Sequence, residues 1–395
     1  MKHLESLSRW TLVAIVFSVI GFAGQTAQAW HVVDYGNGGF LDINYQVQAR
    51  EVMSPTGSGS TGQDSTNNFY LRRDRLSFLG AINDTYGYAL QFEYVGGKKI
   101  GETDISTKGD DYVATVLDAY VTANYSDALN LRVGRTKHVL TREVSEGCFD
   151  PLSTDRSAFI NGPFTQNVWN AKTTRDVGIT AMGNFFSDVL QYRVGIMQGN
   201  NYADASRPAD AGWRYTGRLH LSLLDPEAGW GYRGSYLGKK KVLTLGAGYE
   251  MEPKAVFADG TTGSEDYKAY TLDAFYEQPT EFGTFTLSTA YLNADFGNAG
   301  TRGVAGAGGI NGEKNGYYWK GGYMLGKFQV YGRNEKWSFA QLGPVGQIVT
   351  YRSEGVNYYI NGQELRLTLE FAKTSFDKDH IQPIRALTAQ LQARF

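Results

Sequence analysis

The sequence has one cysteine, five histidines and no excess of charge of either sign. The single thiol, Cys148, cannot form an intramolecular disulfide or a site that needs several thiolate ligands. The 38 basic and 40 acidic residues leave the 395-residue chain near neutral, which excludes the broad basic field that attracts a phosphate backbone. We therefore expect no nucleic-acid partner and no disulfide framework.

Motifs of catalytic sites are missing as well. No Gly-x-Ser-x-Gly, His-Glu-x-x-His or phosphate-loop pattern occurs, and Cys148 has no evident histidine partner. The alternative is a barrel enzyme in which folding brings a Ser or Asp and a His together at one rim, but no sequence feature points to it. We expect no enzymatic activity, no catalytic residues, no metal and no cofactor.

Residues 1–29 have the pattern of an export signal. Lys2 and Arg9 precede an apolar run, and residues 27–29 (Ala-Gln-Ala) supply the small-x-small pattern that signal peptidase accepts. A membrane anchor is the alternative, but the run is short for a bilayer core and ends in polar residues. We predict a cleaved signal peptide over 1–29 and an exported domain over 30–395.

From residue 40 onward, apolar residues recur at every second position, as in strands with one face in an apolar medium. In residues 86–94, for example, Tyr, Leu and Phe alternate with Gly, Ala, Gln and Glu. The predicted strands cover residues 40–52, 68–81, 85–97, 112–125, 129–137, 174–184, 188–199, 213–223, 241–252, 267–278, 283–294, 314–325, 327–337, 349–361, 363–373 and 384–395.

Alternation alone also fits a soluble β-sandwich, and three further features favour a membrane barrel. The number of predicted strands is even, with roughly 23 residues per strand and connection. Aromatic residues lie near strand ends, where the two interfaces of the membrane would be. The segment 387–395 alternates strictly and ends on an aromatic residue, Phe395, which resembles the C-terminal strand of bacterial outer-membrane barrels. We predict an all-β fold, a transmembrane antiparallel β-barrel of about 16 strands in contact with outer-membrane lipid.

A barrel of this size encloses water, so its inward face can carry charge at little cost. The alternation places a set of arginines on this face, and we predict that they line a pore. Together they would favour anions mildly through their local field. The alternative is that single arginines pair structurally with wall acids such as Glu93, Glu335 and Glu370. The predicted pore-lining residues are Arg73, Arg75, Arg132, Arg218, Arg333 and Arg366.

The longest segment without alternation runs from His138 to Thr173 and mixes charged and aromatic residues. Long ordered loops usually have a function. We predict that this one folds into the lumen and constricts it, with charged side chains at the constriction. An external loop without a role in the pore is the alternative. The predicted constriction residues of this segment are Arg142, Glu143, Asp155 and Arg156.

Three other connections are interpreted from composition. Ser54–Asn68 and Gly297–Gly312 are rich in Gly, Ser, Thr and Asn and are predicted to be mobile external loops. The basic run 239–241 is predicted to be a solvated turn or a contact with lipid headgroups.

Five segments resemble the phosphate-selective porin O and P family, in matching order and spacing. They are Arg72-Arg73-Asp74-Arg75-Leu76, Leu131-Arg132-Val133-Gly134-Arg135-Thr136-Lys137, Arg175-Asp176-Val177-Gly178-Ile179, the run 191–199 and the run 355–362. The resemblance implies a sixteen-stranded, trimeric channel with an infolded third loop and wall arginines. It also implies that Lys137 belongs to the constriction. The loop itself departs from the family pattern, because it carries acids such as Glu146 and Asp150 instead of lysines.

The sequence therefore predicts an outer-membrane porin for passive diffusion of small solutes or inorganic anions, assembled as a homotrimer. The alternative is a barrel that acts as a scaffold or sheath for a partner protein, such as an outer-membrane cytochrome. Such a scaffold generally needs a wider lumen than sixteen strands enclose, and the chain has no Cys-x-x-Cys-His haem motif of its own.

Overall fold

The computed structural model describes residues 30–58, 64–95, 113–157, 175–199, 211–258, 263–295, 297, 313–342, 345–377 and 382–395. The predicted signal peptide lies outside the described residues, as does almost all of Gly297–Gly312.

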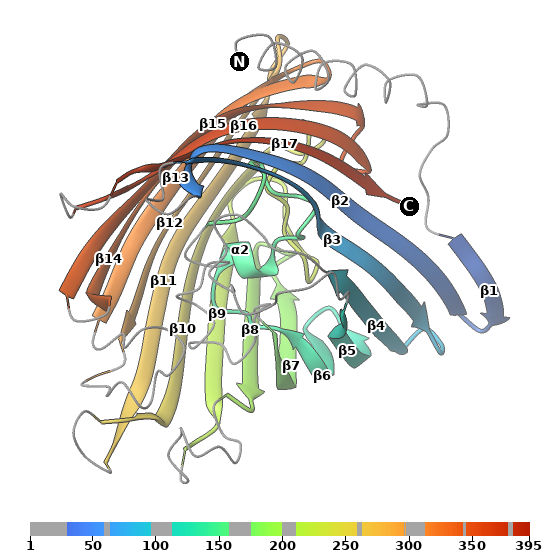
Figure 1. The fold of residues 1–395 in the computed structure, drawn as a ribbon. Helices are drawn as coiled ribbons and strands as arrows, with labels where there is room; N and C mark the ends of the chain where they lie inside the picture. Colours follow the sequence, from blue (N-terminus) through green and yellow to red (C-terminus); the bar gives the residue numbers. More distant parts are fainter. Residues whose placement is uncertain are drawn as a thin grey trace.

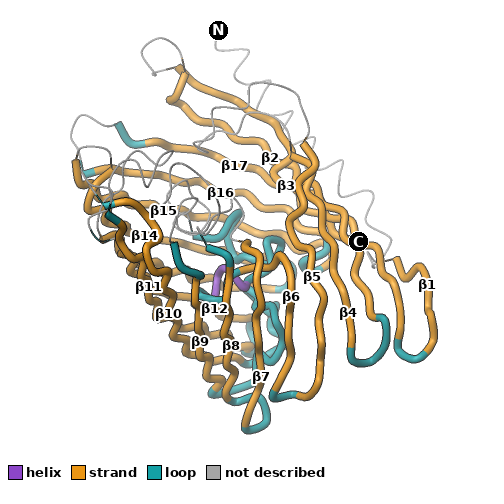
Figure 2. Tube along the Cα trace, turned by 90° about the horizontal axis from the view of Figure 1, so that it is seen from below, coloured by secondary structure: helices purple, strands orange, loops and turns teal. Residues whose placement is uncertain are grey.

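The described residues form seventeen antiparallel strands in one sheet, and sixteen of these close into a barrel (Figures 1 and 2). Each strand from β2 to β17 pairs with the next, and β17 pairs with β2 to close the ring. The strands of the barrel are β2 (Gly39–Ser58), β3 (Asp64–Ala81), β4 (Tyr86–Val95), β5 (Val113–Ser126), β6 (Leu129–Lys137), β7 (Arg175–Phe185), β8 (Leu190–Met197), β9 (Arg214–Ser222), β10 (Val242–Phe257), β11 (Ser264–Pro279), β12 (Thr284–Asp295), β13 (Glu313–Leu325), β14 (Phe328–Leu342), β15 (Val345–Asn361), β16 (Leu365–Phe376) and β17 (Ile384–Arg394).

The alternation of the sequence sets the two faces of this wall. In β8, Val194 and Ile196 are exposed on the outside, whereas Gln191 and Arg193 are buried inside. Aromatic side chains such as Tyr86, at a strand end, stand on the exposed outer face. The prediction of a sixteen-stranded barrel is therefore confirmed. Among the described residues, no helix is long and apolar enough to span a membrane.

Two details of the predicted strands were wrong. The alternation did not reveal β1 (Trp30–Gly36), which pairs with β2 outside the closed ring and projects beyond it (Figure 1). The predicted external loop Ser54–Asn68 is largely strand, because β2 continues to Ser58 and β3 begins at Asp64. Pairing with the neighbouring strand, as between Ser54 and Thr66, extends both strands despite their polar composition.

Connections at one end of the barrel are short, such as 326–327 between β13 and β14, except for 223–241 between β9 and β10, and those at the other end are generally longer. Two connections enter the lumen, one from each end, and Figure 2 shows loop segments and a short helix inside the ring of strands. We call residues 138–157 the inward loop; it follows β6 and contains α2 (Arg142–Ser145). We call residues 223–241 the inward turn; it joins β9 to β10.

Candidate functional site: the lumen

The inward loop and the inward turn meet inside the barrel. Tyr232 N–H donates to the Ser145 carbonyl at 3.2 Å, and Gly147 N–H donates to the Tyr232 carbonyl at 3.3 Å. A third bond runs from Gly234 N–H to the Asp150 carbonyl at 3.1 Å. Segments from opposite ends of the barrel thus satisfy each other's backbone groups, which buried irregular backbone requires. The prediction that the loop folds into the lumen is confirmed for its described part.

A buried ion pair joins the two segments. The single-turn helix α2 begins after Thr141, whose side chain accepts a hydrogen bond from Val144 N–H at 3.1 Å. This turn directs Arg142 toward Glu227 of the inward turn, with Nη to Oε distances of 2.5 and 2.7 Å. Such a two-bond guanidinium–carboxylate pair fixes direction as well as distance. We call this pair the latch.

Aromatic rings surround the latch. The Arg142 guanidinium lies 4.1 Å from the Phe275 ring centre and 4.9 Å from that of Tyr232. Tyr232 also stacks on His220 at 4.6 Å and lies under the Arg193 guanidinium at 4.3 Å. These side chains are buried, so the inward turn fills the part of the lumen that borders β8 and β9.

The second half of the inward loop is extended, and side chains of the wall satisfy its carbonyl groups. Donors from β2 and from β14 to β17 reach successive carbonyls between Cys148 and Arg156. The bonds are Gln48 to Cys148 (3.3 Å), Gln392 to Phe149 (2.8 Å), Arg366 to Pro151 (2.8 Å), Asn357 to Leu152 (2.8 Å), Arg50 to Thr154 (3.1 Å), and Arg333 to Asp155 (3.0 Å) and Arg156 (2.9 Å). This part of the loop is therefore held against one side of the barrel.

Asp155 of the loop is contacted by three arginines, which together we call the arginine cluster. The distances to its carboxylate are 2.9 Å from Arg50, 3.2 Å from Arg72 and 2.8 Å from Arg73. A bulge in β3, where Gln48 pairs with Arg73 but the next residue pairs with Leu71, lets both consecutive arginines reach this inner carboxylate. Although burial raises the pKa of Asp155, the arginines lower it well below its usual value.

The other predicted pore-lining arginines face inward and also have partners. Arg75 bonds Glu93 at 2.8 Å, and Arg218 bonds Asp273 at 2.6 and 2.8 Å. Arg333 pairs with Glu335 in addition to its contacts with the loop. Arg132 lies between the rings of Tyr120 (4.5 Å) and Trp230 (4.1 Å) and is half-buried. The structural pairing that the sequence offered as an alternative thus occurs at several positions.

The predicted constriction residues are mostly engaged in holding the loop. Glu143 pairs with Lys320 of β13, and Arg156 donates to the Glu143 carbonyl at 3.1 Å. Lys137 is the last residue of β6 and donates to the Glu146 carbonyl at 2.9 Å. Arg142, Glu143 and Arg156 are nearly fully buried, whereas the Asp155 side chain keeps 19% of its surface exposed.

Sequence reasoning missed five residues of these pairs: Arg50, Arg72, Glu227, Asp273 and Lys320. Alternation could have found Arg50, Asp273 and Lys320, because each occupies a buried, inward position of its strand. It could not have found Arg72, which the bulge turns inward, nor Glu227, which lies outside any strand.

The buried thiol of Cys148 provides a test of how the loop is packed. Burial raises its pKa, but Arg75, Arg156 and Arg73 lower the pKa well below the usual value, so access rather than protonation limits its reactivity. With 5% of its surface exposed, we expect no labelling by a thiol reagent in the folded barrel and one equivalent after denaturation, measured by mass spectrometry. Fast labelling of the folded barrel would contradict this packing.

The closed barrel of sixteen strands with an inward loop is the fold of the outer-membrane porins. The family model described as phosphate-selective porin O and P matches residues 48–225, which confirms the resemblance seen in the sequence. No curated protein sequence matches the chain.

Three solved structures show the same fold at low sequence identity. OmpF of Salmonella typhi, in complex with daunomycin, is 14% identical, with a TM-score of 0.61 over 92% of this chain and 99% of that one. The anion-selective porin from Comamonas acidovorans is 12% identical, with a TM-score of 0.61 over 90% and 100%. The trimer form of OmpT from Vibrio cholerae is 10% identical, with a TM-score of 0.53 over 91% and 100%.

Among the described residues, no group of three His, Cys, Asp or Glu side chains could hold a metal ion.

Proposed function

We propose that the protein is a non-enzymatic outer-membrane porin, a channel for passive diffusion of small solutes with a mild preference for anions. The observation that carries the proposal is the closed barrel whose lumen is narrowed by a loop fixed to a charged wall. Signal-peptide cleavage after residue 29 and assembly as a homotrimer are part of the proposal; the trimer form of the similar OmpT supports the latter.

The arginine cluster supports the preference for anions. Three guanidinium groups contact one carboxylate, that of Asp155, and this carboxylate keeps some exposure to the lumen. An ion in a narrow passage responds chiefly to charges within about one Debye length, roughly 8 Å at physiological salt. The similar anion-selective porin agrees with this assignment. The predicted Arg73 therefore belongs to the selectivity site together with Arg50 and Arg72.

Reversal potentials in a salt gradient test the proposal. We expect Asp155→Asn to shift the reversal potential toward anion preference and Arg73→Gln to shift it toward cation preference, most strongly at low ionic strength. Asp266→Asn, at the exposed end of β11, is the control and should change nothing. Unitary conductance is measured in parallel to show that the loop stays in place.

Two results would count against the proposal. A wild-type channel that prefers cations, or an Asp155→Asn channel with an unchanged reversal potential, would show that the arginine cluster does not set the ion selectivity. A barrel that forms no channel in a planar bilayer but copurifies with a haem protein in equal amounts would favour the scaffold alternative.

A further inference from the structure

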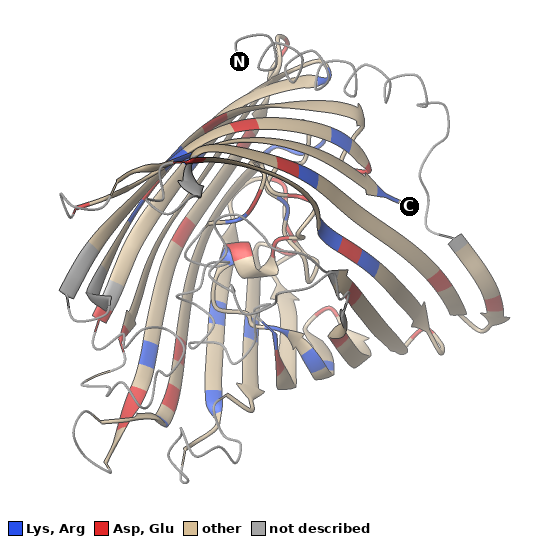
Figure 3. Ribbon diagram, viewed as in Figure 1, with Lys and Arg blue, Asp and Glu red and all other residues tan. Residues whose placement is uncertain are grey.

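Charged residues on the described outer surface of the barrel are concentrated on part of its circumference. In β4, β5, β7, β8 and β9 the charged side chains of the described wall point inward or are buried, and no exposed outward position is charged; on β6, Arg135 stands outward beside Val177. On β14 to β16 and on β2 and β3, by contrast, outward positions near the middle of the strands hold charged residues. Figure 3 shows where charged residues lie along the strands. A charge at this depth on a lipid-facing wall destabilises the barrel, so contact with lipid chains is unfavourable for this part of the wall.

Most of the outward charges beside the seam fall into two groups of opposite sign, and the acidic Glu354 on β15 stands outward next to the basic group. We define the basic face as Lys336, Arg352, Lys373 and Arg385 on β14 to β17, and the acidic face as Glu51 and Asp74 on β2 and β3. The two basic residues Arg352 and Lys373 are paired in register on adjacent strands. Arg352 also donates to the side chain of Asn334 at 3.1 Å. Around the barrel the two faces are neighbours, because β17 pairs with β2.

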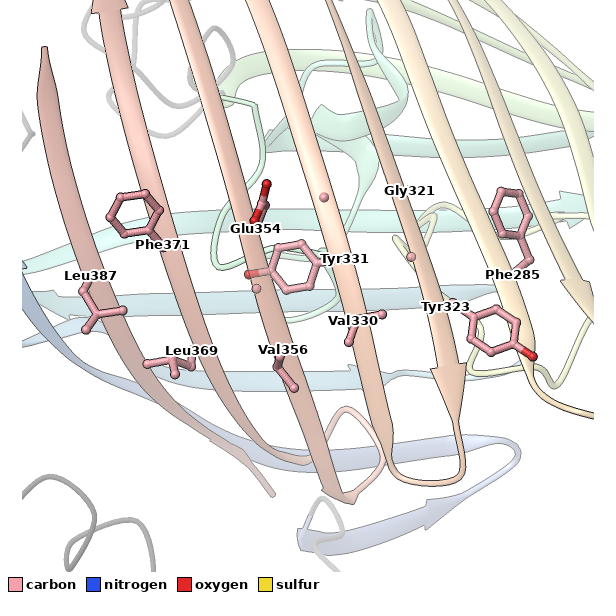
Figure 4. Close-up of a pocket in the computed structure, with 13 residues that line it drawn as sticks. Phe285, Gly321, Tyr323, Val330, Tyr331, Glu354, Val356, Leu369, Phe371 and Leu387 are labelled. Atoms are coloured by element: carbon pink, nitrogen blue, oxygen red, sulfur yellow. The ribbon is translucent and has the colours of Figure 1, made fainter.

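A hollow of about 660 Å³ lies within the basic side of this wall (Figure 4). Gly321 and Gly332 are among the residues that line it. Phe371, Leu387 and the carboxylate of Glu354 stand around it. A Cβ atom placed on Gly332 would meet no atom within 4 Å, so the barrel itself does not require glycine there. The hollow has room for apolar side chains of another molecule.

We propose that the basic face and the acidic face are the two halves of a subunit interface, in which the basic face of one copy of the chain packs against the acidic face of the next. The proposal rests on the proposed function and specifies how its oligomer is built. In a head-to-tail ring the basic face of each copy meets the acidic face of the next copy, and a trimer closes such a ring. Opposite charges fix both register and partner.

A matched pair of glycine substitutions tests the hollow. Gly332 on β14 and Gly217 on β9 both face outward, and in each case an added Cβ meets nothing within 4 Å. We expect Gly332→Leu to raise the monomer fraction about tenfold or more, corresponding to about 1.4 kcal/mol. Gly217→Leu, on the uncharged wall, should leave the oligomer intact. Native mass spectrometry in mild detergent measures both.

Charge reversal tests the pairing. Glu51→Arg with Asp74→Arg, and separately Arg352→Glu with Lys373→Glu, should each yield monomers, and all four changes together should restore the oligomer. Lys268→Glu, outward on β11, is the charge-reversal control. Heat-modifiable migration of every variant shows whether the barrel has folded, and only folded variants are compared.

Three results would overturn the proposal. The wild-type protein could be monomeric, or the oligomer could survive both reversals. Arg352→Glu with Lys373→Glu could also leave the oligomer intact but remove bound lipopolysaccharide. The last would assign the basic face to lipid phosphates. Failure of the proposed function is recognised separately. A protein that is not a porin would show no channel activity in a bilayer, in the wild type and in every variant, whatever its oligomeric state.

Discussion

Glu227→Gln is expected to destabilise the barrel and to raise its unitary conductance. The substitution removes the charge that compensates the buried Arg142 guanidinium, and breaking a buried ion pair in this way costs about 3–5 kcal/mol. The inward loop and the inward turn then keep their few backbone bonds, the bond from Arg142 to the Arg233 carbonyl and the contact of Arg142 with the Tyr232 ring. We expect them to separate part of the time, which widens the passage. Thermal unfolding and planar-bilayer recordings measure the two effects.

A double-mutant cycle separates the latch from general damage. Arg142→Met alone leaves the Glu227 carboxylate buried beside His220, at 3.3 Å, and should also destabilise the barrel. The double variant, which buries neither charge, should recover most of the stability while keeping the raised conductance. If Glu227→Gln unfolds at the wild-type temperature with wild-type conductance, the latch does not hold the two segments together.

The pH dependence of the latch has a defined sign. Burial raises the pKa of Glu227, but Arg142 and His220 lower it by more than burial raises it. The pKa of Glu227 in the folded protein therefore lies below its usual value. A carboxylate with a depressed pKa contributes stability above its unfolded pKa and loses that contribution as the pH falls through the folded one. The latch should therefore persist through mildly acidic media, and the conductance increase caused by Glu227→Gln should be the same at neutral pH and at about pH 5.

The barrel could be predicted because each strand carries its own signal. In residues 190–196 of β8 and 243–251 of β10, apolar residues alternate with polar residues or glycine, and that pattern alone assigns one side to lipid and the other to the lumen. The alternation did not predict β1, because the residues of this strand are exposed outside the ring and need no alternation. A bulge likewise breaks the alternation that would have assigned Arg72.

The interior of the lumen could be predicted only in part. Alternation placed Arg75 and Glu93, and also Arg333 and Glu335, on the inward face, and both pairs form in the structure. It could not show that Glu143 meets Lys320, because their sequence separation of 177 residues is closed only by the barrel. The sequence predicted only a solvated turn or a headgroup contact for 239–241 and did not indicate that the inward turn enters the lumen, since its irregular backbone is fixed by contacts with the inward loop.

Phe395→Asp is expected to reduce the amount of assembled barrel by about tenfold or more, the largest effect at any single position. Phe395 continues the pairing of β17 with β2: its N–H donates to the Tyr45 carbonyl at 2.9 Å, and its carbonyl accepts from Tyr45 N–H at 2.6 Å. The two rings also contact each other, with centres 5.5 Å apart. This seam is where the first and last strands of the barrel join, so every other pair depends on its closure.

The measurement is the fraction of heat-modifiable barrel in the outer membrane, relative to the total exported chain. Phe395→Tyr is the matched control, because it keeps the backbone bonds and the aromatic contact with Tyr45 and should assemble normally. An aspartate places a charge beside that ring at the seam without altering the backbone bonds. Normal assembly of Phe395→Asp would therefore show that backbone pairing alone closes the barrel, and reduced assembly of both variants would trace the defect to the shape of the phenyl ring.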